Sequence, residues 1–318
     1  MKELTKTGFY CVAPDQRGYG KTAFRNKVEK NQNKFSIINL TKDIFILLKR
    51  LKIENIHIIG HDFGAYVASY FSLIYPKMVA SIVLMSMPFA GPPKSMKIPY
   101  SLEVINKNLG KLKPKRKHYQ VYFSKLSTYK SLKNPKQGLY DFLKNYFYFK
   151  SFNYKLNKPN LIKSYTAESL AIMPEYYVMR KYLGISKTVE NISFQDDSDI
   201  FSWLSKKYLK ALEQNFQINS FKYPLYWYRV MLSQKERNRI LDLKLSRSTM
   251  IPAIFITGEA DWGMYQKPGD LKKMKGVFFQ NFFGIKVISN AGHWVQQENL
   301  MDTAKEIKNF YKKLKYIK

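Results

Sequence analysis

The sequence has few of the residues that build cross-linked or metal-bound folds. Its 318 residues include one cysteine and four histidines. A single cysteine excludes a disulfide framework and a cysteine-rich zinc site. The longest apolar stretch, near Met78–Ala90, is interrupted by Ser81, Ser86 and Pro88, so we expect no transmembrane segment. The opening residues MKELTKT contain no apolar run and do not resemble a secretory signal. We therefore expect a cytoplasmic protein.

Acidic residues are also scarce. The chain has 23 Asp and Glu against 54 Lys and Arg, a net charge of +31, and nine of the basic residues are Arg. Because Arg is favoured for bidentate recognition of bases and phosphates, this lysine excess indicates a solvated basic surface and no nucleic-acid partner. The densest basic stretch, Lys107–Lys158, contains thirteen Lys, Arg116 and a single acid, Asp141. Its association with an acidic membrane surface remains a hypothesis.

Apolar material is abundant. The chain is 45% hydrophobic and 16% aromatic, which is enough for a sizeable core and excludes global disorder. We find no internal repeats. The length suits one large domain, or a core with an inserted lid.

Short apolar runs alternate with helical patterns in the first third of the chain. The runs are Phe9–Pro14, Ile56–Gly60 and Ser81–Met87. Apolar residues in Phe35–Leu51 follow a period close to 3.6, and Asp62–Tyr75 has a second helical pattern. This alternation predicts a parallel sheet with crossover helices.

The pattern changes in the middle of the chain. Residues 91–247 contain no similar buried strand run, and helical stretches rich in Lys, Tyr and Phe dominate. Strand patterns return at Ile251–Thr257 and Ile285–Ser289, and Thr303–Tyr316 forms a closing amphipathic pattern. We therefore expect an α/β core, mostly parallel with helices on both faces, from residues 1–92 and 248–318. A helical cap at 93–247 would interrupt it.

Residues 60–64, Gly-His-Asp-Phe-Gly, directly follow one predicted strand and open a helix. The spacing is that of the nucleophile elbow of α/β hydrolases, with Asp62 where Ser is usual. Such a sharp turn needs small residues on both sides because the backbones come close. It also directs the helix N-terminus and the backbone N–H of Phe63 at the reacting group.

A nucleophile at an elbow requires a base and an acid. His57 lies inside a strand pattern, where a packed core histidine is expected, whereas His293 follows the last core strand. Asp261 follows the preceding strand, with Glu259 as a less favoured substitute. The chain order Asp62, Asp261, His293 matches the nucleophile, acid and histidine order of the fold, at three strand ends on one sheet edge.

These motifs resemble an epoxide hydrolase of the α/β-hydrolase superfamily, over nearly the whole chain. The matching segments are APDQRGYG at 13–20, GHDFGA at 60–65, HYQVYF at 118–123, PLYWYR at 224–229, GEAD at 258–261 and GHW at 292–294. Two of them resemble the cap segments that carry the family's epoxide-activating tyrosines. By that match the pair is Tyr119 and Tyr228.

The resemblance implies a two-step reaction. Asp62 would attack an epoxide carbon and form an ester, while the phenols of Tyr119 and Tyr228 donate to the opening oxygen. His293, oriented by Asp261, would then deprotonate a water that hydrolyses the ester, and a vicinal diol would leave.

The remaining expectations concern the pocket and its partners. Phe63, His61 and Trp227 are expected to line the oxyanion site and pocket. The reaction calls for no metal or organic cofactor. The partners are a small apolar epoxide and water, and a homodimer through the cap is left open.

The sequence departs from the family pattern in two places. Trp often follows the nucleophile in the family, and here it is Phe63. No His-Gly pair occurs, so the first strands and the His-Gly-x-Pro loop with the second oxyanion donor are expected to be missing. The third strand of the sheet would be absent between Phe9–Pro14 and Ile56–Gly60.

Three alternatives therefore stay open. One is a haloalkane or haloacid dehalogenase-like hydrolase, although Phe63 lacks the halide-binding donor that usually follows the nucleophile. The others are a truncated, catalytically impaired α/β-hydrolase and a non-catalytic basic scaffold. A serine esterase is disfavoured because no Ser occupies the elbow.

Overall fold

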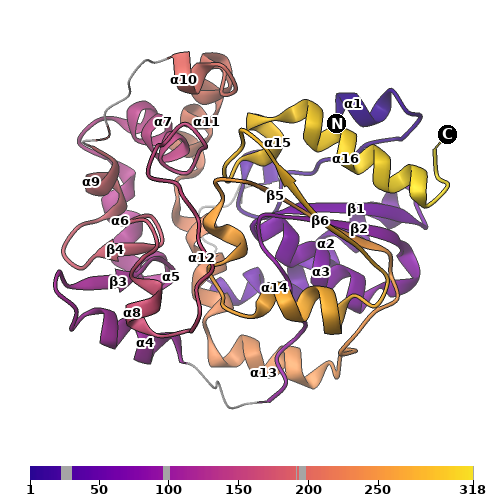
Figure 1. Ribbon diagram of the computed structural model, residues 1–318, viewed down its shortest axis with the longest axis horizontal. Helices are drawn as coiled ribbons and strands as arrows, with labels where there is room; N and C mark the ends of the chain where they lie inside the picture. The colour runs from indigo at the N-terminus through magenta and orange to yellow at the C-terminus, as the bar shows by residue number, and fades with distance from the viewer. Residues whose placement is uncertain (23–30, 96–100, 191, 193–197, 318) are drawn as a thin grey trace.

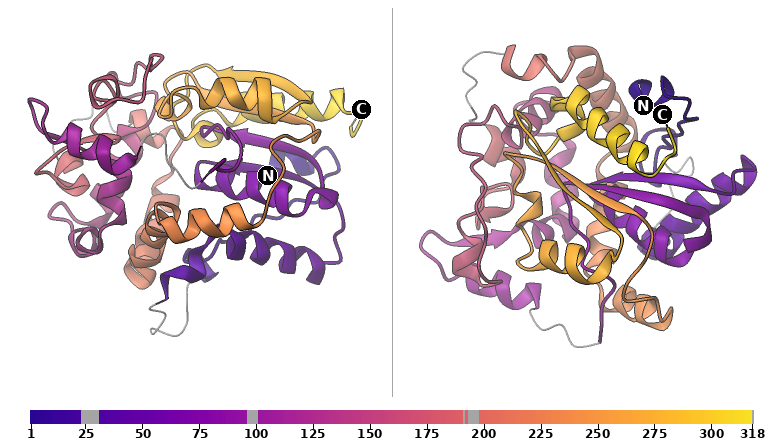
Figure 2. Two further views of the ribbon diagram at one scale, coloured as in Figure 1. Left: turned by 90° about the horizontal axis from the view of Figure 1, so that it is seen from below. Right: turned by 45° about the vertical axis from the view of Figure 1, so that its right-hand side comes forward.

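The computed structural model describes residues 1–22, 31–95, 101–190, 192 and 198–317. Its centre is a parallel four-stranded sheet in the order β1 (Ile56–His61), β2 (Val79–Met85), β5 (Ala253–Gly258) and β6 (Phe282–Ile288). Figure 1 shows helices packed on both sides of this sheet, and Figure 2 shows most of the middle of the chain gathered at one end of it. The predicted α/β architecture is confirmed.

The two faces of the sheet are buried by different helices. Helices α2 (Ile37–Arg50) and α3 (Phe63–Ile74) cover one face and α16 (Leu300–Lys313) covers the other. Side chains alternate between the faces, so Ile82 packs with the α3 cluster and its neighbour Val83 packs with the α16 cluster. Both faces of the central strands are apolar for this reason, and the strands therefore appear as continuous apolar runs in the sequence.

The other α-helices are shorter on average and lie mostly between β2 and β5 in the sequence. They are α1 (Lys2–Thr5), α4 (Leu102–Leu109), α5 (Tyr119–Ser124), α6 (Leu126–Lys133), α7 (Leu139–Phe149), α8 (Ala167–Leu170), α9 (Ile185–Glu190), α10 (Ser198–Phe201), α11 (Lys206–Asn219), α12 (Lys222–Met231), α13 (Gln234–Asp242), α14 (Asp270–Lys273) and α15 (Val295–Glu298). Among the described residues, none is long and apolar enough to cross a membrane.

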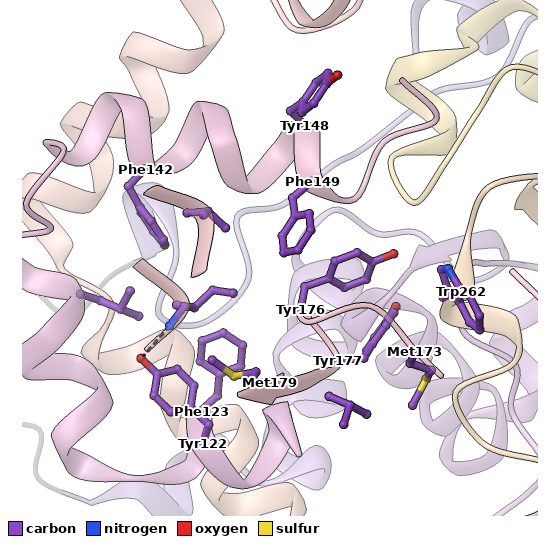
Figure 3. Close-up of a cluster of buried hydrophobic side chains, with 14 of the residues drawn as sticks. Tyr122, Phe123, Phe142, Tyr148, Phe149, Met173, Tyr176, Tyr177, Met179 and Trp262 are labelled. Carbon is purple, nitrogen blue, oxygen red and sulfur yellow. Dashed lines mark hydrogen bonds between the residues drawn. The ribbon is translucent and has the colours of Figure 1, made fainter. Parts of the chain in front are cut away.

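The helical part has a hydrophobic cluster of its own, which is rich in aromatic residues. Figure 3 shows Phe149, Tyr176 and Tyr177 within it, and the hydroxyl of Tyr122 accepts the N–H of Ile185 at 3.2 Å. Helices α12 and α13 also contribute side chains to the hydrophobic cluster between the sheet and helices α2 and α3. The cap boundaries 93–247 stay a prediction, and residues 96–100 within them lie outside the described residues.

Two elements differ from the sequence prediction. Phe9–Pro14 has no regular secondary structure and is not a strand, and Tyr10 is 79% exposed. No strand of the described residues pairs with the outer edge of β1, and an extended segment without a neighbour cannot form a ladder. Conversely, β3 (Arg116–His118) and β4 (Val178–Arg180) form a short antiparallel pair within the helical part, which the sequence pattern did not indicate.

Candidate active site

Asp62 occupies a strained turn between β1 and α3. Its φ is 50° and its ψ is −118°, a conformation that L-residues rarely adopt. A Cβ on Gly60 would lie 2.3 Å from the carbonyl oxygen of Gly64, so Gly60 is required by space. A Cβ on Gly64 would meet only Gln16 Nε2 at 3.8 Å, an ordinary contact. The expectation that the turn needs small residues on both sides is therefore wrong for Gly64, since the chain has already turned into the helix there.

The three residues predicted from the strand ends meet at one edge of the sheet. His293 Nε2 lies 2.9 Å from Asp62 Oδ2, and His293 Nδ1 lies 3.2 Å from Asp261 Oδ1. The side chains of His293 and Asp261 are buried, whereas that of Asp62 is 35% exposed. Glu259 instead accepts the N–H of Asn290 and does not contact the imidazole. The carboxylate that can be reached from outside is thus the one at the elbow.

The charges of this triad are mutually dependent. Burial opposes ionisation of Asp62, but the hydrogen bond from His293 and the positive charges of His293 and Lys150 outweigh it, so the pKa of Asp62 is lowered. Burial likewise opposes the charge on Asp261, yet contacts with His293 lower its pKa. Burial and Lys150 disfavour protonation of His293, but the two carboxylates outweigh them and raise its pKa.

Phe63, His61 and Trp227 have different roles in the geometry. The N–H of Phe63 opens α3 and donates to none of the described residues, so it is available to an oxyanion beside Asp62. The Nε2–H of His61 donates to the carbonyl oxygen of His293 at 2.7 Å, and burial lowers the His61 pKa to about 4. Trp227 donates to the carbonyl of Arg17 at 3.3 Å and packs against Phe63. His61 therefore supports the histidine loop as a neutral donor.

Tyr119 of α5 and Tyr228 of α12 lie next to each other, and Tyr228 contacts the elbow residue Phe63. The rings of Tyr119 and Tyr228 have centroids 6.0 Å apart, and Tyr228 is 4.8 Å from Phe63. Tyr119 donates to Gln266 Oε1 at 2.8 Å and accepts from Gln120 Nε2 at 3.1 Å. The Tyr228 hydroxyl bonds to none of the described residues. Burial is the main reason that the pKa of both phenols is raised, so both keep their protons at neutral pH.

Three residues near the site were missed by sequence reasoning. Gln266 engages Tyr119, Lys150 lies beside the triad, and Glu298 holds the histidine loop. A polar pattern in a loop or a lysine in a lysine-rich stretch carries no local signal for such a role. His57, by contrast, contacts Ser81 and the ring of Tyr311, as expected for a packed core histidine.

A metal site or the hollow between β6 and α16 would be an alternative to this site in position. Within the described ranges, no group of three or more His, Cys, Asp or Glu side chains gathers in a way that could hold a metal ion. A hollow of about 310 Å³ lies between β6 and α16, on the other side of the sheet, and contains none of the predicted site residues.

The chain is similar to known proteins over almost all of its length. A sequence model described as alpha/beta hydrolase fold matches residues 1–300. The bifunctional epoxide hydrolase 2 of Mus musculus is 25% identical over 301 residues, which are 93% of this chain and 45% of that protein. Epoxide hydrolase B of Mycobacterium tuberculosis is 25% identical over 327 residues, which are 96% of this chain and 85% of that protein.

Solved structures give the same result. A laboratory-evolved variant of potato epoxide hydrolase has a TM-score of 0.73 at 25% identity and covers 98% of this chain and 87% of its own. An epoxide hydrolase from an endophytic Streptomyces has a TM-score of 0.74 at 14% identity, covers 95% of this chain and 80% of its own, and shares the fold.

Proposed function

Because the chain belongs to the α/β-hydrolase fold family, we propose that it is an epoxide hydrolase that converts an apolar epoxide to a vicinal diol through an ester on Asp62. The observation that carries the proposal is the elbow: a partly exposed carboxylate with a lowered pKa lies 2.9 Å from His293, and two protonated phenols lie near enough for its charge to raise their pKa. A carboxylate attacks an sp³ carbon without first losing a proton, unlike a serine hydroxyl.

In the first step, Asp62 forms a bond to an epoxide carbon and the ring C–O bond breaks. The electron pair of that bond stays on the oxygen, which takes a proton from a phenol, Tyr228 or Tyr119. The ring of Tyr228 packs 4.8 Å from that of Phe63, the residue after Asp62, and such apolar rings beside the nucleophile suit an apolar substrate.

In the second step, His293 takes a proton from a water molecule that attacks the ester carbonyl. Asp261 holds Nδ1 of the imidazole and stabilises the imidazolium that forms. The N–H of Phe63 faces the oxyanion of the tetrahedral intermediate. When this intermediate collapses, its C–O bond to the substrate breaks, and the leaving alkoxide takes the proton from the imidazolium of His293. The new carboxylic acid of Asp62 then loses its proton, which returns through solvent to the tyrosinate, and the diol leaves.

A single turnover in ¹⁸O-labelled water tests the proposal. The label should enter the carboxyl group of Asp62 and reach the diol only in later turnovers. Asp62→Asn should abolish diol formation, and His293→Gln should accumulate the ester, which intact-mass spectrometry detects. Label found only in the diol would refute the ester route, and halide release from haloalkanes without diol formation from epoxides would favour the dehalogenase alternative.

A further inference from the structure

Lys150 is buried beside the triad, although it lies within the lysine-rich stretch expected to be a solvated surface. Its side chain is 6% exposed. The ammonium lies 5.2 Å from the ring centroid of Trp294, 5.5 Å from that of Tyr177, and 5.7 Å from those of Tyr146 and Tyr176. Four rings around one ammonium form an aromatic cage that stabilises a cation without a direct salt bridge.

The backbone around Lys150 is fixed to the histidine loop. The N–H of His293 donates to the carbonyl of Lys150 at 3.0 Å, and the indole N–H of Trp294 donates to the carbonyl of Phe147 at 2.9 Å. A Cβ on Gly292 would lie 2.7 Å from the Lys150 carbonyl oxygen, so the two segments pack backbone to backbone. The end of α7 and the catalytic histidine are therefore held in one arrangement.

Burying an ammonium group away from water is unfavourable unless nearby groups interact favourably with its charge. Moving a charge out of water costs several kcal/mol after relaxation, and the cation–π contacts with the four rings offset only part of that cost. Burial is the main cause that lowers the pKa of Lys150, and the carboxylates of Asp62 and Asp261 oppose that effect. The same carboxylates define the triad.

Resting on the proposed function, we propose that Lys150 is an electrostatic positioning residue of the reaction: its caged ammonium keeps the His293 imidazole available as a base and supports the negative charge that develops at Asp62. The reason is a balance of charge. Two carboxylates flank one imidazole, so with a neutral imidazole the triad alone carries two negative charges. In the resting enzyme that field favours an imidazolium. In the ester only Asp261 still exerts it, and an imidazolium there could not accept a proton from water.

When the positive charge of Lys150 is included, the triad and Lys150 together carry one negative charge. Protonation of the imidazole is then less favoured. Once Asp62 is an ester, the charges of Lys150 and Asp261 cancel. The oxyanion that forms next at the Asp62 carboxyl group then has a fixed positive charge nearby, in addition to the N–H of Phe63.

Among the described residues, the other titratable groups around His293 are carboxylates and one neutral imidazole. Asp62 and Asp261 flank the imidazole, and His61 is a neutral donor to the histidine's carbonyl. Glu298 accepts the N–H groups of Phe152, Gly292 and Trp294. Burial raises the pKa of Glu298 to about 7, so at lower pH it too is neutral. Among these neighbours, Lys150 is therefore the group that can supply a positive charge without itself serving as the base.

The test measures the protonation of His293 directly and needs no substrate. NMR titration of the histidine imidazoles, assigned with His293→Gln, is compared in the parent protein, Lys150→Met, Lys150→Arg and Lys155→Met. Lys155 is exposed in the same stretch and serves as the matched control. The pKa of His293 should rise in Lys150→Met and stay near the parent value in the other two. An unchanged value in Lys150→Met, or an equal rise in Lys155→Met, would overturn the proposal.

A kinetic measurement completes the experiment. In single turnover near pH 7, ester hydrolysis should slow about tenfold in Lys150→Met, less than the ~10²–10³-fold typical of a lost direct oxyanion donor. The rate should recover in Lys150→Arg, and partly in Lys150→Met as the pH is raised; a loss that does not respond to pH would contradict the role. Lys150→Gln replaces Lys150→Met if the latter does not fold. If the parent protein opens no epoxide, the proposed function fails, while the titration still decides the role of Lys150.

Discussion

The two cap tyrosines should separate stability from catalysis when each is replaced by Phe. The phenol of Tyr119 makes two hydrogen bonds, to Gln266 and from Gln120, and both partners are buried. The phenol of Tyr228 makes none with the described residues. The same chemical change therefore removes two protein contacts in one case and no such contact in the other.

The magnitudes follow from these contacts. Tyr119→Phe leaves the oxygen of Gln266 and one N–H of Gln120 without a partner, which should lower the free energy of unfolding by about 1–3 kcal/mol. Tyr228→Phe should change it by less than about 0.5 kcal/mol. For ester formation the order reverses. Tyr228 holds a proton that none of the described residues engages, so its loss should slow the step by about 10²-fold, within the range of general acid catalysis.

Urea unfolding and single-turnover ester formation measure the two quantities on the same samples. Tyr119→Phe should slow ester formation less than Tyr228→Phe, because the Tyr119 proton must first leave Gln266. A loss of stability in Tyr228→Phe equal to that in Tyr119→Phe would refute the contact argument. An unchanged rate in Tyr228→Phe would refute its role as proton donor.

Three further predictions address the elbow, the histidine loop and the pH dependence. Gly60→Ala should destabilise the fold by about 3 kcal/mol because its Cβ meets the Gly64 carbonyl, whereas Gly64→Ala should stabilise it by up to about 1 kcal/mol in urea unfolding. Glu298→Gln replaces a carboxylate that accepts three N–H groups by an amide with one acceptor oxygen. We expect the free energy of unfolding to fall by about 1–3 kcal/mol and amide exchange at Gly292 to become faster. Because Asp62 raises the pKa of His293 only while it is ionised, the acidic limb of the His293 titration by NMR in the free protein should lie at higher pH than the acidic limb of ester hydrolysis in single turnover. Coincident limbs would contradict that coupling.

The sheet was predictable because its strands are buried on both faces. Ile56–Gly60 and Ile251–Thr257 stand out as apolar runs bounded by helical patterns, and the structure places β1 and β5 within one or two residues of them. Phe9–Pro14 has a similar composition, but a segment becomes a strand only when it pairs with a neighbouring strand. The composition of a segment does not tell whether that neighbour is present. The positions of Asp62, Asp261 and His293 followed from topology, since parallel strands end at one edge.

Lys150 could not be found in this way, and the reason lies in the composition. Lys150 is one of thirteen lysines in its stretch, and the sequence does not distinguish it from its solvated neighbours. The rings that enclose it include Tyr146, on the helix α7 that ends just before Lys150, and Trp294, which is distant in sequence. Only folding brings those rings and the histidine loop around one ammonium. A sequence pattern can locate catalytic residues at strand ends, because the topology brings those ends together. A charged residue that changes their pKa acts through space, and the fold decides which of many similar lysines is enclosed beside them.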